Sequence, residues 1–221
     1  MKMRNPLLGL LTFTFHDVGR NILYILPLPL LLGIAAQILR IDALLVFFQL
    51  FAIGSAPYIV MMKVVAMKSV GTLTWDRYQI AMPIKRKNVA SIHYLSVLIA
   101  SLLGIPIIGI IWMVLYVLFG STLVETLNGG LSTMAAIYSM LLISASVLYP
   151  LILSQLGQRN AQGVFLGSVI IGAAVGSGMF GAGNAMGLTD TTLSLIIAGV
   201  SGIAFVVSLF ITRAKYAKMD F

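Results

Sequence analysis

The sequence contains no cysteine and little charge: of its 221 residues, 9% are Asp, Glu, Lys or Arg and 60% are hydrophobic. The missing cysteines exclude a disulfide framework, an iron-sulfur cluster and any thiolate metal site, and leave the redox compartment undetermined. A soluble domain carries about 25% charged and about 45 to 50% apolar residues. The composition therefore excludes an ordinary water-soluble globule and indicates that lipid surrounds most of the chain.

Six apolar runs are each long enough to cross about 30 Å of hydrocarbon at about 1.5 Å per residue. We predict an all-α, polytopic membrane protein with one transmembrane domain over residues 1–221 and spans at about 22–39, 43–62, 90–119, 131–153, 164–182 and 193–211. Pro106 and Pro150 predict kinks rather than breaks, because neighbouring helices satisfy the carbonyls that proline frees. The third run is overlong, so we expect its start, near His93, to project from the bilayer.

The N-terminal residues 1–20 are predicted to form an interfacial helix. Apolar side chains recur at spacings of three and four, which places them on one face of a helix, at Leu7, Leu8, Leu11 and Phe15. The polar residues Thr12, His16 and Asp17 would then face water. No small-x-small cleavage site follows, so an uncleaved leader is the weaker alternative.

The distribution of cations predicts the topology. Lys plus Arg number 14 against six Asp plus Glu, a net charge of +8 that in a soluble protein would suggest nucleic acid. Here thirteen cations fall before the first span, after the last one or in alternate loops, and Arg40 alone lies on the other side. The positive-inside rule places both termini in the cytoplasm and requires an even number of spans. The charge therefore indicates membrane orientation, and we expect no nucleic-acid partner.

The middles of the predicted spans contain no Asp, Glu, Lys, Arg or His. Secondary carriers and proton pumps need such groups for ion coupling, so an independent carrier is the least favoured interpretation. No zinc-protease pair, nucleophile elbow or phosphate-binding loop occurs, and His16 and His93 lie near membrane edges, where we expect them to be solvated. We therefore predict no catalytic, cofactor-binding or metal-binding residue and no enzyme activity in this chain.

Glycines crowd the fifth predicted span and the segment after it. Gly163 with Gly167, Gly172 with Gly176 and Gly183 with Gly187 each form a small-xxx-small pair, and Gly181 lies between the last two pairs. Such pairs let helix backbones approach closely, and tight packing is the interpretation we favour. The alternative is a flexible or re-entrant segment over Gly176 to Gly187 that forms an outer gate.

The cytoplasmic loop over residues 63–89 carries six cations and a predicted helix over 74–82, with Thr74 as its N-cap and Pro83 as its stop. One face of this helix presents Trp75, Tyr78 and Met82. These aromatics suit a lipid interface, with the basic segment Lys85, Arg86 and Lys87 on anionic lipid, and they suit a protein docking surface equally well. The pattern alone leaves both interpretations open.

The string Trp75-Asp76-Arg77-Tyr78-Gln79, followed by Met82-Pro83-Ile84, Arg86-Lys87 and Tyr94, resembles the first cytoplasmic loop of ABC-2 type transporter permeases, particularly the compact bacterial class. The resemblance implies that residues 74–82 form a coupling helix that docks, through Trp75 to Pro83, on a separate ATPase subunit, where ATP and Mg are bound. It implies two ATPase copies and a second permease, identical or different. It further implies a bacterial cytoplasmic membrane and export of amphipathic substrates such as toxic or antimicrobial peptides.

The leading hypothesis from the sequence is thus the membrane subunit of an ATP-driven exporter. The rival is a non-transporting membrane scaffold or immunity protein that binds a toxin or partner through its glycine-rich face. The sequence leaves open the substrate, the direction of transport and whether the permease pairs with itself.

Overall fold

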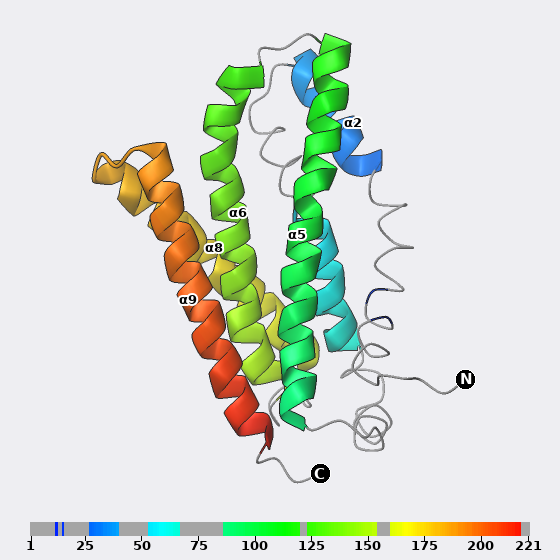
Figure 1. Ribbon diagram of the computed structural model, residues 1–221, viewed down its shortest axis with the longest axis vertical. Helices are drawn as coiled ribbons and strands as arrows, with labels where there is room; N and C mark the ends of the chain where they lie inside the picture. The colour runs from blue at the N-terminus through cyan, green and yellow to red at the C-terminus, as the bar shows by residue number, and fades with distance from the viewer. Residues whose placement is uncertain are drawn as a thin grey trace.

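The computed structural model describes residues 12, 15, 27–39, 53–66, 86–119, 123–153 and 160–217. Apart from short connecting turns, these residues are helical, and none of them lies in a strand. The labelled helices are α2 (Pro27–Leu39), α5 (Arg86–Phe119), α6 (Leu123–Ile152), α8 (Ala161–Ala185) and α9 (Asp190–Ala217), together with an unlabelled helix, Ile53–Ala66 (Figure 1). The predicted all-α class is confirmed.

Four of the helices are long and apolar enough to cross a membrane: Asn88–Pro106, Met134–Ile152, Ala161–Gly183 and Thr192–Lys215. They correspond to the third, fourth, fifth and sixth predicted spans. Where the first two spans were predicted, the structure describes the 13-residue α2 and the helix Ile53–Ala66. The remaining residues of those two ranges lie outside the described part of the chain, as does most of the predicted interfacial helix.

Several helices extend beyond the predicted spans. α5 begins at Arg86 and α6 at Leu123, so the basic pair Arg86 and Lys87 forms the first turn of α5 instead of a loop. α8 continues without interruption to Ala185. Residues 176–185 are thus part of a regular helix. Pro106 and Pro150 lie inside continuous helices, as expected of prolines that do not break a span.

The turn between α8 and α9 is closed by a glycine. Gly187 has a φ of +67°, which is the left-handed conformation that side chains other than glycine rarely adopt. The N–H of Leu188 donates to the carbonyl of Gly183 at 3.2 Å, the six-to-one bond of a Schellman motif. Thr189 then accepts the N–H of Thr192 at 3.4 Å and starts α9. The chain therefore reverses within a few residues.

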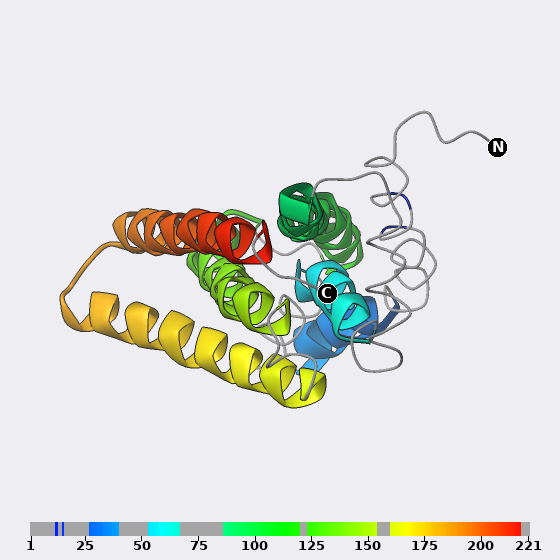
Figure 2. The ribbon, with the colours of Figure 1, turned by 90° about the horizontal axis from the view of Figure 1, so that it is seen from below.

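α6 is the central helix of the bundle. It contacts α5, α8 and α9, and α8 and α9 lie on either side of it when the bundle is viewed along its long axis (Figure 2). In that view α8 is drawn almost along its whole length, whereas α5 is foreshortened, so α8 is strongly inclined to α5. The spanning windows of α5 and α6 are each 56% buried, against 18% for α8. Most of α8 therefore faces lipid or a partner.

The helices are closely packed at one end, which we call the lower end: there α5 begins and α6 and α9 finish (Figure 1). Among the described side chains of α5, every buried one precedes Ile105, whereas Met113 and Val117 are 69% and 76% exposed. The core is formed at this end by the helix Ile53–Ala66, α5 and α6, with Phe205 from α9. The bundle is thus closed at its lower end.

Candidate functional site

A hydrogen bond between helices compensates for the proline in α6. Pro150 has no N–H, so the carbonyl of Ser146, four residues earlier, lacks its helical donor. The hydroxyl of Ser208 on α9 donates to this carbonyl at 2.5 Å. Polar groups cannot find water inside a bilayer and must be satisfied within the protein. The hydrogen bond that compensates for Pro150 therefore links α6 to α9.

Tyr94 extends this connection to α5. Its hydroxyl lies 2.6 Å from Ser208 Oγ and 2.8 Å from Thr212 Oγ1, two side chains one turn apart on α9. Thr212 in turn donates to the Ser208 carbonyl at 2.8 Å. Tyr94 is 1% exposed and Thr212 is 1% exposed, so water does not compete for these bonds. We call Tyr94, Ser146, Ser208 and Thr212 the hydroxyl network; it links α5, α6 and α9 at the lower end.

Aromatic rings enclose the hydroxyl network. The Tyr94 ring lies 4.8 Å from the Tyr149 ring and 5.0 Å from the Phe205 ring, between centroids, in tilted and edge-on arrangements that aromatic pairs favour. His93 stacks on Tyr149 with centroids 6.0 Å apart. His93 is only 2% exposed, so the expectation that it is solvated is wrong. Tyr149 of α6 stacks on the imidazole and contributes to its burial.

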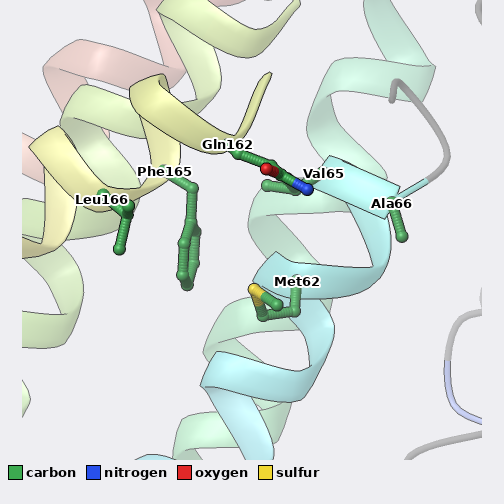
Figure 3. A pocket seen from close by; sticks show the side chains of 6 residues that line it. All are labelled: Met62, Val65, Ala66, Gln162, Phe165 and Leu166. Atoms are coloured by element: carbon green, nitrogen blue, oxygen red, sulfur yellow. The ribbon is translucent and has the colours of Figure 1, made fainter. Parts of the chain in front are cut away.

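A groove lies between the helix Ile53–Ala66 and the start of α8. Its volume is about 280 Å³, and its lining is Met62, Val65, Ala66, Gln162, Phe165 and Leu166. The side chains come from the two helices, and Gln162 is the only polar residue among them (Figure 3). Met62 and Leu166 are 49% and 60% exposed, so the groove opens to the surroundings of the bundle. Such a surface suits an apolar ligand with a single polar group.

The glycines of α8 divide into two groups. A Cβ on Gly172 would meet Ser144 Oγ and, at 2.6 Å, the Met140 carbonyl, and a Cβ on Gly176 would meet Met140 Cγ at 2.5 Å. This pair lets α8 approach α6, as small-xxx-small spacing predicts. Gly183 fits closely against Leu193 of α9.

The other predicted packing positions do not contact a second helix. A Cβ on Gly167 or Gly181 would meet nothing within 4 Å, and one on Gly163 would meet only Asn160. Asn160 is the N-cap of α8, because its Oδ1 accepts the Gly163 N–H at 3.0 Å. Within the described residues, Gly163 and Gly167 therefore contact no second helix.

The predicted docking residues Trp75, Asp76, Arg77, Tyr78, Gln79, Met82 and Pro83 lie outside the described residues, as does Lys85. The described basic residues all belong to the lower end: Lys63, Arg86, Lys87, Arg213 and Lys215. The described carboxyl residues, Glu125 and Asp190, start α6 and α9 at the opposite end. Among the described residues, the cations thus gather at the lower end and the carboxyl groups at the opposite end.

The described residues contain no group of three or more His, Cys, Asp or Glu that could hold a metal ion. These residues instead bring hydroxyl groups and aromatic rings together. Of the hydroxyl network, the predictions from the sequence named only Tyr94. Two spacings could have revealed them: Ser146 precedes Pro150 by four residues, and Ser208 precedes Thr212 by four. The first marks a carbonyl that needs a donor, and the second marks a hydroxyl face on one helix.

The comparisons with known proteins bear on this arrangement. No curated protein and no solved structure matches the chain. Residues 17–217 match the family described as ABC-2 family transporter protein, which covers the hydroxyl network, the groove and the predicted docking loop. The match extends over far more than half of the sequence. A helical membrane bundle without ion-coupling residues in its predicted spans agrees with such a match, and the chain belongs to the ABC-2 transporter family.

Proposed function

We propose that this chain is the membrane-spanning subunit of an exporter driven by ATP hydrolysis in a separate ABC ATPase. The family match over residues 17–217 carries the proposal, because ABC-2 family proteins are the membrane components of ABC transporters. The sequence has no phosphate-binding loop of its own. Energy must therefore reach the helices from a partner.

The coupling site we propose is the helix predicted over residues 74–82, with Trp75 and Tyr78 as its anchors. Aromatic residues dominate the energetics of protein interfaces, and both lie in the loop with the highest density of cations. α5 begins at Arg86, a few residues after this helix. A displacement of the loop would therefore act directly on the end of α5 that carries Tyr94.

An amphipathic or hydrophobic substrate, such as a membrane-active peptide, is the class we propose. The groove supports this class, since its walls are apolar and Gln162 supplies one amide. It lies at the end of the bundle that the cation distribution assigns to the cytoplasm. A ligand partitioned into the inner leaflet would reach it sideways, without crossing the headgroups.

The functional unit we propose contains two permeases and two ATPases in a bacterial cytoplasmic membrane, with both termini of the permease inside the cell. The low burial of α8 supports a second permease, because a largely uncovered helix has room for a partner. The experiment that tests the function also determines whether the two permeases are identical or different.

The test is reconstitution of the permease with its candidate ABC ATPase, in vesicles of phosphatidylethanolamine and phosphatidylglycerol. We expect the two to co-purify in mild detergent and a labelled amphipathic helical peptide to stimulate ATP hydrolysis. Trp75→Ala with Tyr78→Ala should abolish that stimulation while insertion in the membrane is retained.

Phe210→Ala is the matched control, since Phe210 is 62% exposed on α9 and belongs to neither the loop nor the groove. It should leave the stimulation unchanged. If no ATPase co-purifies and the double variant behaves like the wild type, the exporter proposal is wrong and a non-transporting scaffold or immunity protein is supported.

A further inference from the structure

Tyr94 occupies the position through which movement of α5 reaches α9. It lies about two turns after Arg86, the first residue of the helix. Its hydroxyl contacts Ser208 and Thr212, which are 114 and 118 positions further along the chain. A displacement at the start of α5 must either carry α9 along or break these contacts.

The hydroxyl network has fewer protons than contacts. Its three hydroxyls, on Tyr94, Ser208 and Thr212, supply three protons, and four short contacts compete for them. Ser208 donates to the Ser146 carbonyl and Thr212 to the Ser208 carbonyl, which leaves the Tyr94 proton for both side-chain contacts. One O–H can serve only one acceptor fully. One of the two contacts of Tyr94 is therefore always without a proton.

Beside this network lies a donor that is not used. Tyr149 is fully buried, and among the described residues its hydroxyl has no hydrogen-bond partner. Its ring is 4.8 Å from the Tyr94 ring, between centroids. A buried hydroxyl without a partner is costly and calls for an explanation. A second conformation in which it is paired supplies one.

We propose that Tyr94 and Tyr149 are the positioning residues of a two-state relay, an inference that rests on the proposed function. In the state seen here, Tyr94 holds α9 and Tyr149 is unpaired. In the second state, which movement of the docking loop favours, α5 shifts and the Tyr149 hydroxyl donates to one of the two α9 hydroxyls, that of Ser208 or that of Thr212. In each state a different tyrosine hydroxyl lacks a full hydrogen bond. The two states therefore contain similar numbers of hydrogen bonds, and ATP can switch between them.

In the relay, the hydroxyl of Tyr149 forms a hydrogen bond only in the second state. Removing this hydroxyl should therefore have opposite effects on the stability of the first state and on the population of the second. Tyr149→Phe removes an unpaired buried donor, so the thermal midpoint without nucleotide should rise or stay unchanged. The same variant should reduce the population of the ATP-dependent state about two- to tenfold, the range of one ordinary hydrogen bond. A purely structural tyrosine would not produce this combination.

Spin labels can follow the switch, because the chain has no cysteine and an introduced pair is the only one in each permease copy. We would label Leu95→Cys on α5 and Ala214→Cys on α9, both exposed, in the permease–ATPase complex reconstituted in phosphatidylethanolamine and phosphatidylglycerol. Pulsed EPR distances with and without ATP and vanadate then report both states. Tyr94→Phe should increase the ATP-type population without ATP, and Tyr149→Phe should decrease it with ATP.

Tyr138→Phe is the matched control. It also removes one hydroxyl between two helices, since Tyr138 donates to the Ser101 carbonyl at 2.9 Å, but it lies outside the network. It should leave the distribution unchanged. A wild type whose distances ignore ATP contradicts the proposed function, and the relay with it. A wild type that responds, with Tyr149→Phe responding equally, overturns the relay alone.

Discussion

Ser208 on α9 donates its hydroxyl proton to the main-chain carbonyl of Ser146 on α6, at 2.5 Å. The bond exists because Pro150 cannot supply the helical N–H that this carbonyl would otherwise accept. The hydrogen bond that α6 lacks at Pro150 is thus replaced by a contact with α9. The two bonded residues are 62 positions apart in the chain.

The first prediction is a coupling between Ser208 and Pro150. Ser208→Ala should lower the free energy of unfolding by about 1 kcal/mol, because it leaves the Ser146 carbonyl without a donor. In a Pro150→Ala background the restored main-chain N–H can take that carbonyl, so the loss should be smaller. Unfolding in mixed detergent micelles gives the four values of the cycle. Ser201→Ala is the control, since Ser201 bonds to the Ile197 carbonyl within α9; equal losses at Ser208 in both backgrounds would contradict the account.

The second prediction separates two glycines of α8. Gly172→Ala should destabilise the bundle by about 1 to 3 kcal/mol, because the new methyl group meets Ser144 and the Met140 carbonyl of α6. Gly167→Ala should be neutral or stabilise by up to about 1 kcal/mol, since its surroundings are open and alanine favours helix. Thermal unfolding in detergent measures both. Similar effects at the two positions would show that α8 does not pack on α6 through Gly172.

The third prediction concerns the turn after α8. Gly187→Ala should cost about 1 kcal/mol, because its φ of +67° is unfavourable for a residue with a Cβ, even though no atom lies within 4 Å of that Cβ. Gly187→Asn should cost less, since asparagine tolerates this conformation. The comparison of the two thermal midpoints distinguishes backbone strain from crowding. Asparagine as disruptive as alanine would point to another cause.

The fourth prediction tests the groove. Ala66→Trp should fill part of its volume of about 280 Å³ and reduce peptide-stimulated ATP hydrolysis several-fold. Ala198→Trp is the control, because Ala198 is exposed on α9 and does not line the groove. The ratio of stimulated to basal ATPase activity in vesicles is the measurement. If both variants retain the wild-type ratio, the groove does not take the peptide.

The sequence was sufficient to predict the class of fold and the long apolar helices, because hydropathy over some twenty residues reports directly on burial in lipid. Helix ends were harder to place. α6 begins at Leu123, within a stretch containing Glu125, Gly129 and Gly130 that hydropathy excludes from a span. Helical hydrogen bonding continues past the point where the surroundings cease to be apolar, so the span and the helix have different bounds.

The site was only partly predictable. The docking loop resembled that of a family, and the family match bears out the resemblance without testing the docking residues. The burial of His93 and the bonds of Tyr94 depend on which helices stand beside α5 at that height, and no local pattern encodes that. The glycines show the same limit: the pairs Gly163–Gly167 and Gly172–Gly176 have the same four-residue spacing, but of these two pairs only the second faces α6.

The inclination of α8 has a consequence for the membrane itself. Its apolar span, Ala161–Gly183, has 23 residues and is roughly 35 Å long at about 1.5 Å per residue. A tilt fits this length to about 30 Å of hydrocarbon, so the inclination of α8 matches its span to the bilayer. Thicker bilayers should draw α8 upright and loosen its contact with α6 at Gly172.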